Sequence, residues 1–167
     1  MEEYFDGSLN IAIIGMAARF PGAENIEQFW ENLCAGKETI HFFSDDELKT
    51  AGISQSELDT PGYVKAAPIL KDIELFDAPF FDYTPMEAAF MDPQQRLFLQ
   101  VICGAIENAG YSVQNFSGTR TGLFVGATNP EYSYVITRKL DKIPVAAMTG
   151  TSVCILANRM SYLLNLK

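Results

Sequence analysis

Few side chains in this 167-residue sequence are of the types that carry out catalysis, and their spacing does not combine them. The only histidine, His41, lies in a polar-to-aromatic loop, and no serine or cysteine partner can be assigned to it from spacing. Asp45, Asp46 and Glu47 stand where a helix first turn favours acidic residues, so we interpret them as structural. The glycines lack the spacing of a phosphate-binding loop. The residues alone therefore predict no catalytic constellation.

Three cysteines, Cys34, Cys103 and Cys154, are an odd number, and none of them belongs to a C-x-x-C pair. A reactive thiol requires a helix N-terminus or a cationic neighbour, whereas Cys154 stands between two apolar residues of an expected helix. We therefore expect buried, reduced thiols that pack in a core, with no metal site and no disulfide.

The net charge is −9, from 21 acidic and 12 basic residues, which disfavours nucleic acid and anionic membranes as partners. No apolar run approaches the length of a membrane span, and the acidic N-terminus does not follow a signal-peptide pattern. We therefore expect a cytoplasmic protein. A small basic cluster, Arg138, Lys139 and Lys142, is either a solvated helix end or a docking point for an acidic partner.

Two consecutive helices are predicted at the centre of the chain. Thr84 and Glu87 have the spacing of a capping box, and Asp92 then caps a second helix over 93–109 that Gly110 ends. This second helix is apolar around most of its circumference, which is typical of a buried helix. Four of its residues fall on one face, namely Phe98, Ile102, Ala105 and Ala109, and four others widen this face most of the way round, namely Leu97, Leu99, Val101 and Ile106.

The rest of the chain should pack on this helix. Apolar runs at 11–14 and 121–126 predict two short strands buried on both faces, and 63–73 should be extended at an edge because it contains Pro68. The other expected helices are 26–35, two short ones opened by Ser44 and Ser54, 130–140, and 149–167. Two strands are too few for a parallel sheet, so the pattern suggests an incomplete fold.

Several segments, in order, resemble the β-ketoacyl synthase (ketosynthase) domain of modular type I polyketide synthases. They are IAIIGMAARFPGA, FDAPFFDYTPMEAAFMDPQQRLFLQVICGAIENAGY, TGLFVGA and TSVCILANRMSYLLNLK. MDPQQR followed by a helix that ends in ENAG is the most specific of these signals. The chain departs from the family at Ala18, where cysteine is usual, and at Asp82, Tyr83 and Thr84, where Gly-Ile-Ser is common.

The resemblance implies an α/β fold, specifically the N-terminal part of a thiolase-like, layered α-β-α fold that is incomplete on its own. Residues 1–10 would be a leader or linker and residues 11–167 the N-terminal portion of the ketosynthase domain. The family's nucleophilic cysteine and its two catalytic histidines are expected beyond Lys167, and His41 matches neither histidine. No catalytic residue is therefore expected in this chain, which should be inactive alone.

The resemblance also implies the reaction of the complete domain, a decarboxylative Claisen condensation of acyl and malonyl-type units. The substrates would be presented on carrier-protein phosphopantetheine, with no cofactor bound directly. Partners would be the remaining C-terminal part of the ketosynthase, a second protomer in a homodimer, and an acyl carrier protein. By position, Ala147, Met148 and Thr149 resemble a segment that reaches the acyl tunnel in related enzymes, with ordinary packing as the alternative.

A second hypothesis is a split-off, non-catalytic module that dimerises or links synthase subunits. The continuation after Lys167 would distinguish the two hypotheses. On either hypothesis, the isolated chain is expected to expose apolar surface, because the strands it contributes would lack neighbours.

Overall fold

The computed structural model describes residues 10–128, 131–138 and 142–167. The chain divides into two compact units, one formed by Met1–Ala17 with Ile73–Lys167 and the other by Ala18–Asp72. Most of the expected leader, and Lys139 of the basic cluster, lie outside the described residues. The division into a leader and one domain portion therefore stays a prediction.

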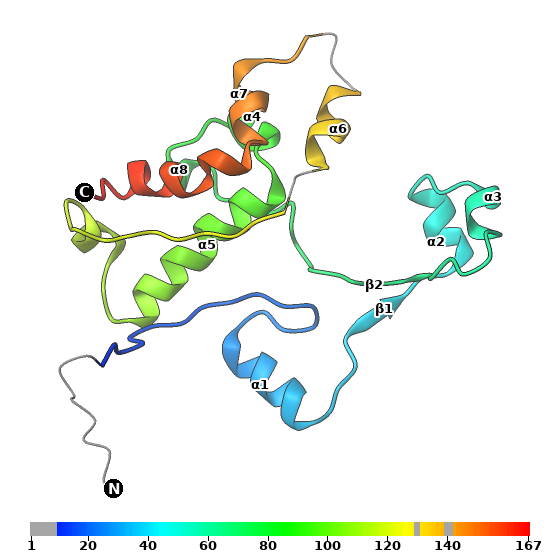
Figure 1. Cartoon of the computed structure of the whole chain (residues 1–167), viewed down its shortest axis with the longest axis horizontal. Helices are drawn as coiled ribbons and strands as arrows, with labels where there is room; N and C mark the ends of the chain where they lie inside the picture. Colours follow the sequence, from blue (N-terminus) through cyan, green and yellow to red (C-terminus); the bar gives the residue numbers. More distant parts are fainter. Residues whose placement is uncertain (1–9, 129–130, 139–141) are drawn as a thin grey trace, which may run out of the picture. The chain divides into compact units, whose positions relative to one another are not determined.

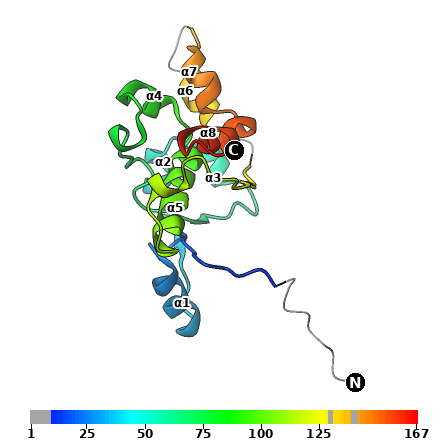
Figure 2. The same ribbon diagram turned by 90° about the vertical axis from the view of Figure 1, so that its left-hand side faces the viewer.

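The larger unit is helical in its described part (Figure 1). Its elements are η2 (Pro79–Phe81), α4 (Pro85–Phe90), α5 (Pro93–Asn108), η3 (Val113–Phe116), α6 (Tyr132–Thr137), α7 (Val145–Gly150), η4 (Val153–Ile155) and α8 (Leu156–Leu163). Helices α5 and α8 lie side by side in both ribbon views (Figures 1 and 2). The two helices contribute most of the buried apolar cluster, which makes α5 the centre of this unit, as its sequence predicts.

The two helix starts predicted at the centre of the chain are confirmed. The Thr84 hydroxyl accepts the backbone N–H of Glu87 at 3.2 Å, and the Glu87 carboxylate accepts the backbone N–H of Thr84 at 2.9 Å. The Asp92 carboxylate accepts the backbone N–H of Gln94 at 2.7 Å and so caps α5. Gly110 follows α5 with φ of +82°, the left-handed conformation that ends many helices.

The buried side of α5 agrees only in part with the expected one, because Leu99 and Ile106 were expected to widen the apolar face and Cys103 was not. Leu99, Cys103 and Ile106 are its most buried apolar residues, whereas the expected face is only half-buried at Phe98 and Ile102. Met91 from the preceding turn and Met160 from α8 complete the best-buried positions, each at 1% exposure. A helix that is apolar all round does not reveal from periodicity which side its neighbours cover.

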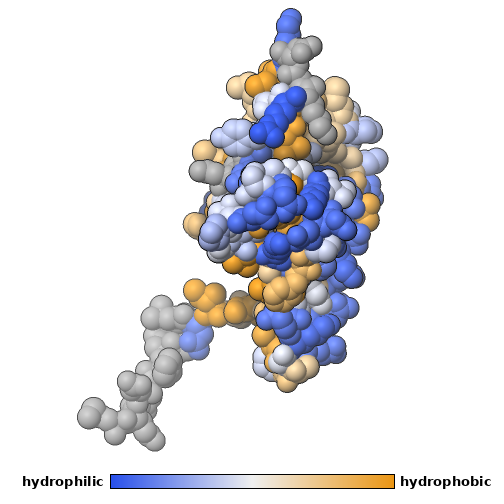
Figure 3. Space-filling view, turned by 90° about the vertical axis from the view of Figure 1, so that its right-hand side faces the viewer, coloured by the Kyte–Doolittle hydropathy of each residue, from blue (hydrophilic) through white to orange (hydrophobic). Residues whose placement is uncertain are grey.

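Neither predicted buried strand is a strand in the structure. Residues 11–14 and 121–126 are extended, but no hydrogen-bonded strand pairs with them in the part of the chain that the structure describes. Ile11 is 94% exposed and Phe124 is 96% exposed. Figure 3 shows the stretch next to the grey N-terminal residues in orange, the colour of hydrophobic residues. A strand requires a neighbouring strand, and an apolar run alone does not supply one.

The prediction of one continuous helix over 149–167 is wrong. Gly150 instead ends α7, Thr151 is its C-cap, and the chain turns through η4 before α8 begins at Leu156. The helix expected over 130–140 is the shorter α6, and Pro130 lies outside the described residues. Threonine and serine side chains that bond to nearby backbone compete with a continuous helix, which favours the break at 151–152.

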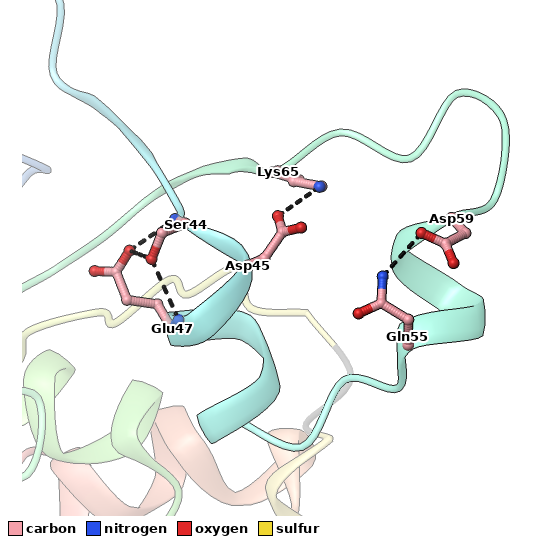
Figure 4. Close-up of polar contacts among 6 residues, drawn as sticks. All are labelled: Ser44, Asp45, Glu47, Gln55, Asp59 and Lys65. Atoms are coloured by element: carbon pink, nitrogen blue, oxygen red, sulfur yellow. Dashed lines mark hydrogen bonds and ion pairs between the residues drawn. The ribbon is translucent and has the colours of Figure 1, made fainter.

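The smaller unit contains α1 (Ile26–Cys34), β1 (Ile40–Phe42), α2 (Asp45–Thr50), α3 (Gln55–Leu58) and β2 (Ala66–Pro68). The two strands pair antiparallel, with His41 opposite Ala67. The extended segment expected at 63–73 is confirmed at 66–68, where β2 lies, but not at Asp72, whose φ is +54°. The partner strand β1 was not predicted. Figure 4 shows the capping box of Ser44 and Glu47 and the ion pair between Lys65 and Asp45, with Nζ and Oδ1 2.5 Å apart.

Candidate functional site

The MDPQQR motif comprises the turn between α4 and α5, Met91 and Asp92, and the first four residues of α5, and the turn holds the C-terminal end of α7. We call this contact region the α7 junction, made of Tyr83, Met91, Asp92, Gly150 and Arg159. Met91 is 1% exposed and Asp92 is 4% exposed, so the turn belongs to the core. The backbone N–H of Asp92 donates to the carbonyl of Gly150 at 2.9 Å, which satisfies one carbonyl that the end of a short helix leaves unpaired.

Gly150 allows the two backbones to approach closely. A β-carbon at this position would meet the backbone carbonyl of Phe90 well inside the 3.0 Å that real β-carbons keep, and it would lie 3.2 Å from the α-carbon of Met91. The obstacle is backbone, which cannot rotate away as a side chain can. A glycine is therefore required here by space, since its φ angle is an ordinary one.

Arg159 of α8 connects two further segments at the α7 junction. Its Nη1 donates to the Tyr83 hydroxyl at 3.0 Å, and its Nη2 donates to the carbonyl of Thr149 at 3.1 Å. The guanidinium carbon also lies 5.4 Å from the centroid of the Tyr83 ring, within the range of a cation–π contact. A positive charge at the C-terminal end of a helix is favourable to the helix dipole.

The other polar residues of MDPQQR form hydrogen bonds with three more segments of the chain. Gln95, 3% exposed, donates through Nε2 to the carbonyl of Ser152 at 3.1 Å. Arg96 donates through Nη1 to the carbonyl of Glu74 at 3.3 Å, and Gln94 accepts the Thr128 hydroxyl at 3.2 Å. These side chains therefore act as structural connectors, which explains polar residues on a buried helix face.

The three expected tunnel residues lie together in α7 but in different environments. Ala147 is 3% exposed, Thr149 is half-buried, and Met148 is 63% exposed. The Thr149 hydroxyl donates to the carbonyls of Val145 and Ala146 at 3.3 and 3.2 Å, so it is occupied within its own helix. Of the three side chains, Met148 is therefore the one available to contact another molecule.

The remaining candidates for chemistry have structural surroundings. His41 Nε2 lies 3.6 Å from Oε1 of Glu47 at the surface, and its ring contacts the Phe43 ring edge-on. Burial, with a smaller contribution from the charge of Glu107, raises the pKa of the Cys103 thiol and keeps it protonated. The expectation of buried cysteines holds for Cys103 alone.

Cys34 and Cys154 are exposed, contrary to expectation. Cys34 ends α1, a helix without a fully buried residue in the described part of the chain, and Cys154 stands in η4 instead of a helix interior. An apolar sequence context predicts burial only where a second element covers it.

No cluster of three or more metal-binding side chains exists among the described residues. Within the same residues, the helices are too short or too polar for one of them to traverse a lipid bilayer. The docking role considered for the basic cluster stays a prediction, because Lys139 lies outside the described part.

Sequence reasoning missed three members of the α7 junction, namely Tyr83, Gly150 and Arg159. A signal was available for Gly150, because Gly-Thr-Ser in positions 150–152 is a combination that disfavours a continuous helix. Tyr83 and Arg159 are 76 residues apart in the sequence, so no local pattern could reveal their contact.

Comparison with known proteins gives a consistent result. The family model described as "Beta-ketoacyl synthase, N-terminal domain" matches residues 9–167. A phenolphthiocerol/phthiocerol polyketide synthase of Mycobacterium tuberculosis is 49% identical over 109 residues, which cover 65% of this chain and 7% of the relative. Polyketide synthase PksL of Bacillus subtilis is 37% identical over 159 residues, which cover 94% of this chain and 3% of the relative.

Solved structures agree with the sequence comparison. The ketosynthase from module 1 of the bacillaene synthase of Bacillus amyloliquefaciens superposes with a TM-score of 0.73 at 32% identity, over 93% of this chain and 27% of that one. Ketosynthase twelve of the bacillaene polyketide synthase of the same species gives 0.70 at 31% identity, over 93% and 28%. The chain thus spans about a quarter of these solved ketosynthases.

Proposed function

The chain belongs to the β-ketoacyl synthase family, and we propose that it works as the N-terminal segment of a polyketide synthase ketosynthase. The fold class expected from the sequence, the N-terminal part of a thiolase-like α/β fold, agrees with its solved relatives. The observation that carries the proposal is the match of the family model over 9–167, which includes MDPQQR with its buried Met91 and Asp92.

The chemistry of the complete domain follows from its family. A cysteine thiolate accepts an acyl chain from the phosphopantetheine thioester of a carrier protein, and the phosphopantetheine thiol leaves. Two histidines then assist loss of CO₂ from a malonyl-type unit. The resulting enolate attacks the acyl carbonyl, so a carbon–carbon bond forms while the carbon–sulfur bond to the cysteine breaks and its thiolate leaves. We expect the cysteine and histidines outside this segment, so the segment alone should be inactive.

The segment would contribute structure to this reaction in three ways. It supplies the α5–α8 core, a surface for a second protomer, and part of the wall of the acyl tunnel. For the tunnel wall we propose Ala147, Met148 and Thr149, in which Ala147 anchors the helix and the exposed Met148 contacts the acyl chain. Its partners would be the C-terminal part of a ketosynthase, a second protomer and an acyl carrier protein.

Reconstitution tests this proposal. This chain and the complementary portion of a related ketosynthase are prepared separately and mixed, and a carrier protein loaded with an acyl-phosphopantetheine is added. Mass spectrometry then measures acyl transfer to the active-site cysteine of the complementary portion. We expect transfer only when both portions are present. The control is this chain with Cys34→Ser and Cys154→Ser, which removes the two exposed thiols that could be acylated without specificity.

Transfer to the complementary portion alone, at an undiminished rate, would contradict a structural contribution from this chain. Association of the two portions without transfer would favour the alternative, a module that links synthase subunits. The relatives described above are synthases and ketosynthases, which does not favour that alternative.

A further inference from the structure

Helix α7 is too short to be stable by itself. It has six residues, and its N-cap, Pro144, has no side-chain acceptor for the first N–H groups. Helices of this length are unstable in water unless other parts of the protein hold them. At its N-terminal end, Ile143 and Val145 are 53% and 74% exposed. The contacts that hold α7 must therefore lie elsewhere.

The C-terminal end of α7 carries those contacts. The carbonyl of Gly150 accepts the N–H of Asp92, and the carbonyl of Thr149 accepts Nη2 of Arg159. The buried Ala147 adds apolar contact. Two consecutive carbonyls are thus held by two different segments, one by backbone and the other by a charged side chain.

Arg159 is suited to this contact because its guanidinium is a rigid fork. One nitrogen bonds the Thr149 carbonyl while the other bonds the Tyr83 hydroxyl, so Tyr83 fixes the angle at which the fork meets α7. A lysine would keep the charge but could not reproduce the planar geometry of both bonds. The position of the Thr149 backbone therefore depends on the Arg159–Tyr83 pair.

We propose that Arg159, oriented by Tyr83, is a positioning residue that sets where α7 holds Met148 and thereby tunes which acyl chains fit. The first part of this proposal, that Arg159 and Tyr83 position α7, rests on the contacts described above. The consequence for acyl chains rests on the proposed function, in which Met148 belongs to the tunnel wall. Met148 directly precedes Thr149, so a shift of the Thr149 carbonyl moves the Met148 backbone with it.

The positioning of α7 by Arg159 and Tyr83 is tested on this chain by hydrogen–deuterium exchange of the peptide that contains 145–150. The variants are Arg159→Lys, which keeps the charge, and Tyr83→Phe, which keeps the ring but removes the hydroxyl. Both should exchange about tenfold faster in this peptide, because a hydrogen bond with a charged partner is weakened or lost. Arg120→Gln, at an exposed arginine, is the control and should leave the exchange unchanged. Unchanged exchange in both variants would overturn the proposal.

The consequence for acyl chains is tested in the complete enzyme with a short and a long acyl-phosphopantetheine substrate. In Arg159→Lys and Tyr83→Phe we expect the ratio of kcat/KM for the two substrates to change at least about fivefold, mainly through KM. A merely structural role would lower kcat/KM equally for the short and the long substrate, and this result would overturn the positioning role. If the unmodified enzyme transfers neither acyl chain, the proposed function fails. The exchange experiment still decides whether Arg159 and Tyr83 position α7.

Discussion

The backbone N–H of Asp92 donates to the carbonyl of Gly150 at 2.9 Å, so the turn before α5 and the end of α7 share a hydrogen bond. The side chain of the same aspartate caps α5 by accepting the N–H of Gln94 at 2.7 Å. One residue therefore fixes both the start of the central helix and the end of the helix that carries the proposed tunnel wall. This double role makes the α7 junction the place where substitutions should be most informative.

Gly150→Ala should destabilise the protein. Its β-carbon would collide with the backbone carbonyl of Phe90, and we expect the free energy of unfolding to fall by about 1–3 kcal/mol. The loss should outweigh the gain of about 1 kcal/mol by which alanine favours a helix over glycine. Urea unfolding followed by circular dichroism measures the difference.

The control for this substitution is Gly126→Ala, where no atom lies within 4 Å of the added β-carbon. We expect it to change the free energy of unfolding by less than about 0.5 kcal/mol. If Gly150→Ala is as harmless as the control, α7 does not approach the α4–α5 turn as closely as described.

Asp92→Ala should lower the free energy of unfolding by about 0.5–2 kcal/mol, because it removes the acceptor that caps α5. Asp92→Asn keeps an acceptor at the same place and should stay within about 0.5 kcal/mol of the unmodified chain. The same urea titration compares all three proteins. Equal losses in both variants would show that the charge of Asp92, instead of its capping bond, stabilises the turn.

The helix starts were predictable because each depends on residues close together in sequence. Thr84 and Glu87 are three positions apart, and a capping box needs nothing beyond that spacing. Asp92 caps α5 for the same local reason. The start of α7 was missed, because its N-cap, Pro144, has no side-chain acceptor from which a cap could be predicted.

The strands and the α7 junction were not predictable in the same way. A strand at 11–14 depends on neighbouring strands, which no property of an Ile-Ala-Ile-Ile run guarantees. The contact between Arg159 and Tyr83 joins distant parts of the chain, and a polar residue in an apolar helix does not indicate its partner. Of the candidate site, the family resemblance suggests only Ala147, Met148 and Thr149, and their role in the acyl tunnel stays a prediction.

The capping box of α4 should make stability depend on pH. The Glu87 carboxylate accepts the Thr84 hydroxyl at 2.7 Å and the Thr84 N–H at 2.9 Å, and these bonds lower the pKa of Glu87 from its ordinary value. Because the folded pKa is the lower one, the stabilisation is present above the unfolded pKa and is lost as pH falls through the folded value.

Glu87→Gln keeps an acceptor in the capping box but cannot titrate. Its free energy of unfolding should therefore fall less steeply than that of the unmodified chain between about pH 5 and about pH 3. The measurement is a series of urea titrations across that interval. Identical slopes for the two proteins would contradict a lowered pKa of Glu87.

The exposed apolar residues before α1 should bind hydrophobic dyes. Ile11, Ile13 and Ile14 are 94%, 82% and 62% exposed. Exposed apolar stretches promote self-association, so we expect the isolated chain to enhance dye fluorescence and to elute larger than 18.5 kDa in gel filtration. Ile13→Lys should reduce both effects. A monomer that unfolds cooperatively and does not bind the dye would contradict this prediction.

Met148→Trp should change acyl preference without destabilising the protein. Met148 is 63% exposed, so added bulk meets solvent in this chain, and the free energy of unfolding should change by less than about 0.5 kcal/mol. In the complete enzyme, the same bulk would narrow the proposed acyl tunnel. Acylation with bulky chains should then slow by about tenfold or more relative to acylation with acetyl, because a filled pocket excludes larger groups.

Met86→Trp provides the matched control for this prediction. Met86 is 66% exposed on α4, so the same substitution adds the same bulk at a similarly exposed site outside α7. For this variant, we expect the ratio of the acylation rate with bulky chains to the rate with acetyl to equal that of the unmodified enzyme. If Met148→Trp also leaves the ratio unchanged, Met148 does not contact the acyl chain, and α7 packs as an ordinary surface helix. A change confined to Met148→Trp would link the exposed side of α7 to substrate choice.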